Sequence, residues 1–69
     1  MKRFLFSLWY VGKDNHKQVE SHEESFECQA DAQVRARAIL NEAKRDKCGL
    51  QIDLYEKRGN AWKHIVSYQ

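Results

Sequence analysis

The segment from Phe4 to Val11 most constrains the fold, because it is apolar on both faces of a strand. Its residues read Phe-Leu-Phe-Ser-Leu-Trp-Tyr-Val. A strand that is buried on one face alternates apolar and polar residues, whereas a nearly continuous apolar run indicates burial on both faces. The rest of the chain predicts a single helix, and one helix covers only one face of a sheet. We therefore expect a second copy of the chain, a different partner or a ligand to cover the second face.

The length of the chain favours association as well. Its 69 residues predict one small domain, residues 1–69. A chain this short buries only about 60% of the surface that its unfolded form exposes, and disulfides, metals or oligomerisation usually add stability. The two cysteines, Cys28 and Cys48, are too few for a disulfide scaffold and fit a reducing, cytoplasmic compartment. Oligomerisation is the remaining supplement, and it agrees with the two-faced first strand.

Composition and charge exclude several classes of protein. The chain is 42% hydrophobic and 12% aromatic, whereas disordered chains have few aromatic residues and a large net charge. The net charge of +2 is too small to argue by itself for a nucleic-acid partner. Met1-Lys2-Arg3 and the apolar run resemble the start of a signal peptide, but the run leads into a polar turn rather than a small-residue cleavage site. The run is also too short to cross a membrane as a helix, so we expect a strand and no membrane partner.

Alternation and turn residues predict two hairpins. The expected strands are residues 4–11, about 18–29, 50–55 and 61–68. Polar turn residues at 12–17 join the first pair, and residues 57–60 join the second pair, with Gly59 at a position that needs a positive φ. The first half of the second strand is polar on both faces, which suits the edge of a sheet.

Between the hairpins, residues 32–47 predict a helix. Asp31 is the expected N-cap, and Gly49 is the expected residue that stops the helix at its C-terminal end. Strong helix formers fill the segment. One stripe at helical spacing is expected to face the core and consists of Ala32, Ala36, Ile39, Leu40 and Ala43.

The element order β-β-α-β-β predicts an α+β fold, a four-stranded antiparallel sheet in the order 2-1-3-4 with the helix packed on one face. The residues expected to face the helix are Phe4, Phe6, Leu8, Tyr10, Leu50, Ile52 and Leu54. The opposite face is expected to carry Leu5, Ser7, Trp9, Val11, Gln51, Asp53 and Tyr55. The last strand stays ambiguous, with Trp62, Val66 and Tyr68 on one side and Ala61 and Ile65 on the other.

The chain shows no catalytic, cofactor or metal signature, so we expect neither an enzyme nor a metal protein. His22 and Cys28 share a side of the second strand, but six residues of strand separate them by about 20 Å. Their simpler interpretation is a solvated edge histidine and a small core thiol beside Phe26. Cysteine chemistry needs a base and a lowered thiol pKa, and neither Cys28 nor Cys48 has a neighbour that predicts both.

The helix-free face of the predicted sheet is the candidate site. Leu5, Trp9, Val11 and Tyr55 resemble the aromatic and apolar anchors of a protein interface. We therefore expect a small cytoplasmic interaction domain, a homodimer or a binder of another protein. The alternative is a nucleic-acid-binding module in which Trp9 and Tyr55 stack bases. The residues that would then hold phosphates are Lys2, Arg3, Lys13, Lys57, Arg58 and Lys63. A metal protein or an enzyme is the third alternative.

Overall fold

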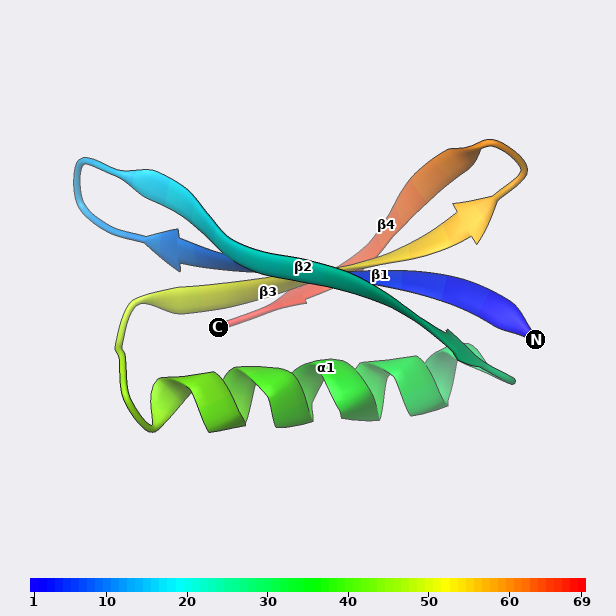
Figure 1. Ribbon diagram of the computed structural model, residues 1–69, viewed down its shortest axis with the longest axis horizontal. Coiled ribbons are helices and arrows are strands. Elements are labelled where there is room, and N and C mark those ends of the chain that lie inside the picture. The colour runs from blue at the N-terminus through cyan, green and yellow to red at the C-terminus, as the bar shows by residue number, and fades with distance from the viewer.

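The computed structural model describes all residues from 1 to 69 and contains four strands and one helix. In chain order these are β1 (Lys2–Val11), β2 (His16–Phe26), α1 (Gln29–Lys44), β3 (Leu50–Arg58) and β4 (Ala61–Tyr68). The strands form one antiparallel sheet in the order β2-β1-β3-β4. The helix lies on one face only, and both hairpin tips rise away from it (Figure 1). The predicted α+β fold and strand order are confirmed.

The core lies entirely between the sheet and α1. Alternate residues of β1 and β3 turn toward the helix, and each residue of the core is at most 4% exposed. The nine residues are Phe4, Phe6, Leu8, Leu50, Ile52, Leu54, Ala32, Ala36 and Leu40. Fully burying one large apolar side chain contributes about 1.5–3 kcal/mol, so the six large residues of the two central strands dominate the stability of the fold. The two alanines let the helix approach the sheet closely.

Tyr10 also lies on the helix side of the sheet, as expected, but it is 41% exposed. Its ring lies near Gly49, in the loop that joins α1 to β3, rather than beneath a helical turn. The expected burial of the first strand on the helix side therefore ends at Leu8.

The predicted bounds of the helix are wrong by three residues at each end. Cys28 occupies the N-cap position in an extended conformation and makes no side-chain cap hydrogen bond, while Asp31 lies in the first turn. There its charge still suits the positive end of the helix dipole. At the other end the amides of Arg45 and Asp46 donate to carbonyls three residues earlier, and this tight turn ends the helix at Lys44. Gly49, with a φ of 74°, therefore lies within the loop rather than directly after the helix.

The strand bounds also differ from the prediction by up to three residues, and one difference matters for Cys28. β2 ends at Phe26, and the chain turns before α1, so Cys28 is exposed and the predicted core thiol is wrong. β1 and β3 are longer than predicted, and β4 has its predicted bounds. Gly59 has a φ of 61°, which confirms the expected positive φ in the second turn.

Each edge strand contains a β-bulge. In the pairing of β1 with β2, Leu8 faces Glu20 and Trp9 faces Gln18, which leaves Val19 as an extra residue. In the pairing of β3 with β4, the register shift leaves Ile65 as the extra residue. A bulge reverses the alternation of the strand beyond it.

The second bulge resolves which side of β4 faces the helix. Val66 and Tyr68 pair with Leu54 and Ile52 and pack against the core. Beyond the bulge, Trp62 pairs with Lys57 and lies on the opposite face. The predicted grouping of Trp62 with Val66 and Tyr68 is therefore wrong.

Candidate interaction face

The sheet face opposite α1, named the helix-free face, brings together the four predicted anchor residues. Leu5, Trp9 and Val11 come from β1 and Tyr55 from β3, and all four side chains are half-buried. Leu5 lies opposite Tyr55, but Trp9 lies opposite Gln51, four residue pairs farther along the two strands. The anchors therefore form two apolar groups, Leu5 with Tyr55 and Trp9 with Val11, rather than one continuous patch. Sequence reasoning did not predict this division.

A hydrogen-bonded polar row separates the two groups. The carboxylate of Asp53 accepts a bond of 2.8 Å from the side-chain amide of Gln51 and one of 2.6 Å from the hydroxyl of Ser67. The side-chain amide of Gln69 donates in turn to the side-chain oxygen Oε1 of Gln51 at 2.8 Å. The charge of Asp53 is thus compensated by donors on its own face.

The same row places a serine, a histidine and an aspartate together. The ring nitrogen Nε2 of His64 lies 2.8 Å from the Ser67 hydroxyl, which itself bonds to Asp53. In a catalytic triad the imidazole stands between the carboxylate and the hydroxyl and removes the hydroxyl proton. Here the hydroxyl stands in the middle and donates to the carboxylate, so the imidazole can only donate to it. The order of the three groups therefore does not provide a base for the serine.

Tyr55 and Trp9 are the two aromatic anchors of the prediction. Burial raises the pKa of the Tyr55 phenol, and the negative charge of Asp53 raises it further, so the hydroxyl stays neutral at physiological pH. The Tyr55 ring meets the His64 ring edge to face, with centroids 5.4 Å apart.

The indole N–H of Trp9 is buried and has no acceptor. Trp9 Nε1 is the one buried side-chain nitrogen or oxygen that lacks a hydrogen-bond partner. Such an unsatisfied donor costs about 1–3 kcal/mol of stability.

The six basic residues of the nucleic-acid alternative do not form one patch. Arg3 and Lys57 lie at the end of the helix-free face where β3 and β4 turn. Arg3 faces the Glu23 carboxylate at 3.7 Å, and the Lys57 ammonium stands 5.6 Å from the centre of the Trp62 ring. The other four lie on the helix side or in the turns, and they are Lys2, Lys13, Arg58 and Lys63.

On the helix side, β2 is tied to α1 by polar groups. Glu24 accepts hydrogen bonds from His22 at 2.7 Å and from Arg35 of the helix at 3.0 Å. Burial acts to raise the pKa of Glu24, but these two hydrogen bonds and the nearby charges outweigh it and hold the pKa below its ordinary value. His22 also stacks on the buried Phe6 ring at 5.2 Å, while its side chain stays 38% exposed, so this edge histidine contacts both the core and solvent.

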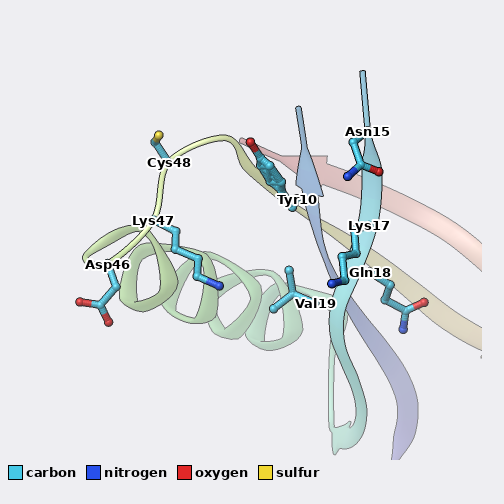
Figure 2. A pocket seen from close by; sticks show the side chains of 8 residues that line it. All are labelled: Tyr10, Asn15, Lys17, Gln18, Val19, Asp46, Lys47 and Cys48. Carbon is cyan, nitrogen blue, oxygen red and sulfur yellow. The ribbon is translucent and has the colours of Figure 1, made fainter. Parts of the chain in front are cut away.

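A second notable region is a hollow of about 630 Å³ on the helix side, between the β1–β2 hairpin and the loop after α1 (Figure 2). Its lining residues are Tyr10, Asn15, Lys17, Gln18, Val19, Asp46, Lys47 and Cys48. Sequence reasoning missed this hollow. The one available signal was Val19, a lone apolar residue in a polar segment.

Metal-binding residue types are dispersed in the structure. No group of three or more His, Cys, Asp or Glu side chains lies close enough together to hold a metal ion. Both cysteines are exposed and free. In addition, α1 is neither long nor apolar enough to cross a membrane.

No protein-family description matches the chain, and neither the curated proteins nor the solved structures contain a significant match to it.

Proposed function

We propose that this protein is a non-enzymatic interaction module that self-associates through the helix-free face. The observation that carries the proposal is the one-sided core. All nine core residues lie between the sheet and α1, while the half-buried Leu5, Trp9, Val11 and Tyr55 have no layer above them. A second copy would supply that layer and add the buried area that a chain of this size lacks.

The charges of the helix-free face support association, because most are already compensated within the chain. Asp53 accepts two hydrogen bonds, and Arg3 is paired with Glu23. Removing charged groups from water is unfavourable unless they have partners. Internal pairing lowers this cost for a dimer that covers the face.

The dimensions of the molecule set how much of the face a dimer must use. The longest and shortest extents of the whole molecule, 35 × 16 Å, give a twisted sheet face of this size a projected area of about 560 Å². Two such faces total about 1,100 Å², and a specific interface buries at least about 1,000 Å² in total. A stable dimer therefore requires nearly the whole face, polar row included.

The test is the solution mass of the wild type and of two glutamate variants, from micromolar to near-millimolar concentration. Trp9→Glu places a charge in the face of each copy, because a two-fold interface repeats every substitution. Val34→Glu is the matched control, since Val34 is 67% exposed on the outer side of α1. We expect a dimer for the wild type and the control and a monomer for Trp9→Glu. A monomeric wild type with a concentration-independent melting temperature would contradict the proposal.

A second candidate function is binding of single-stranded nucleic acid. It is favoured by the Lys57 ammonium over the Trp62 ring and by Arg3 at the same end of the face. Replacing a stacking aromatic residue costs about 1–3 kcal/mol of binding, so Trp9→Ala and Tyr55→Ala, and Trp62→Ala beside Lys57, should each weaken binding by that amount. Replacing Lys57 should reduce the salt dependence. If a mixed-sequence RNA shows no salt-sensitive binding, this candidate is removed.

We also propose a reducing, cytoplasmic location. Both thiols are free and solvent-accessible, a state that persists where the cell keeps cysteines reduced.

A further inference from the structure

The hollow beside Tyr10 has the size of a ligand site. Its volume of about 630 Å³ falls within the range of about 300–1,000 Å³ that is usual for small-molecule sites. It lies on the opposite side of the sheet from the helix-free face, so occupation of one does not require the other. Its walls come from β1, β2 and the loop after α1 (Figure 2).

One β-bulge and two glycines shape these walls. The bulge in β2 makes Val19 the extra residue, and its side chain points toward the helix (Figure 2). Gly12 lets the Tyr10 ring lie against the backbone, since a Cβ at this position would meet three ring atoms at 3.2 Å. Gly49, at a φ of 74°, turns the α1–β3 loop back so that its carbonyl accepts a 2.7 Å hydrogen bond from the Val11 amide. The two glycines thereby position the Tyr10 ring and the α1–β3 loop, which form two of the walls.

The lining combines exposed apolar groups with positive charge. Tyr10 and Val19 are 41% and 44% exposed, and they are two of the four large apolar side chains that the fold leaves most exposed. Lys17 and Lys47 approach the hollow from opposite walls, while the carboxylate of Asp46 points away from it (Figure 2). The ammonium groups of Lys17 and Lys47, together with the apolar surfaces of Tyr10 and Val19, complement a ligand that is apolar at one end and negatively charged at the other.

We propose that this hollow binds a small amphipathic anion, an aromatic or short aliphatic group that carries a carboxylate, sulfonate or phosphate. The apolar group lies on Tyr10 and Val19, and the acidic group lies between the ammonium groups of Lys17 and Lys47.

Anilinonaphthalene sulfonate is a suitable probe because it joins an aromatic group to a permanent negative charge and fluoresces when it leaves water. Its affinity is measured for the wild type and for the double variant Lys17→Gln/Lys47→Gln. The control double variant, Lys13→Gln/Lys63→Gln, has the same net charge but changes no lining residue. We expect about tenfold weaker binding in the first variant, because charge-assisted hydrogen bonds are the stronger kind, and little change in the control.

Two further measurements locate the probe. Gly12→Ala shifts the Tyr10 ring by only a few tenths of an ångström, so it should change binding less than the double variant Lys17→Gln/Lys47→Gln. The uncharged analogue that lacks the sulfonate should bind the wild type less tightly. Near-ultraviolet circular dichroism establishes that each variant keeps its packed core, since loosely packed states bind this probe nonspecifically. Equal affinities in the two double variants, or equal binding of the uncharged analogue, would overturn the proposal.

Discussion

Replacement of Leu40 by alanine tests whether α1 holds the fold together as the structure indicates. Leu40 is 3% exposed, and the other two buried residues of the helix are alanines. Leucine-to-alanine changes in a core cost about 2–5 kcal/mol, and the upper part of that range applies because no other large side chain of α1 is fully buried. A domain of this length has a total stability of about 3–10 kcal/mol. The variant should therefore lose a large share of its stability.

The matched control is Val34→Ala in the same helix. Val34 is 67% exposed, and alanine favours the helix over valine by up to about 0.7 kcal/mol, so the control should be unchanged or slightly more stable. Urea unfolding followed by circular dichroism, at one protein concentration for all variants, measures both changes. Each kcal/mol lowers the melting temperature of a small domain by about 4–8 °C, so Leu40→Ala should melt at least about 12 °C lower. A loss below about 1 kcal/mol would refute the packing of α1 through this face.

Three other predictions concern Ala36, Glu24 and the two cysteines. Ala36→Leu should destabilise the fold by about 1–3 kcal/mol in urea unfolding, because Ala36 is completely buried and the helix lies close to the sheet; unchanged stability would mean that a void lies there. The lowered pKa of Glu24 stabilises the fold above the ordinary carboxyl pKa, and this contribution is lost as the pH falls through the lowered pKa. Unfolding at neutral and at acidic pH should therefore show a smaller acid-induced loss in Glu24→Gln than in the wild type, and equal losses would count against the prediction. Cys28 and Cys48 should both react with a thiol reagent without denaturant, since both are exposed; one slow thiol would indicate a covered cysteine.

The parts of the fold that sequence reasoning predicted are those where a period persists over several residues. Phe4, Phe6 and Leu8 lie on one side of a strand whatever its exact ends, and they pack against α1 as expected. The predicted stripe of α1 is equally independent of where the helix begins, since Ala32, Ala36 and Leu40 are buried and Ile39 and Ala43 pack against the core. Both patterns repeat long enough for burial to outweigh local preferences.

Local features were less predictable. Asp31 is a better capping residue than Cys28 by propensity, but the chain already adopts helical geometry at Gln29, so the aspartate lies within the first turn. The bulge at Ile65 has no sequence signal, because His-Ile-Val suits a regular strand equally well. The contact between Asp53 and Ser67 on the helix-free face depends on the register of β4, and the sequence left that register open.

The bulges at the two edges of the sheet have a further consequence for how copies of the chain can assemble. A straight edge strand offers a row of free amides and carbonyls on which another chain can grow, and this is the route to open-ended fibrils. In this protein the bulges in β2 and β4 interrupt that row of backbone groups, and β2 also carries the acidic side chains of Glu20 and Glu23. The bulges and the acidic side chains therefore disfavour the addition of further strands at both edges of the sheet.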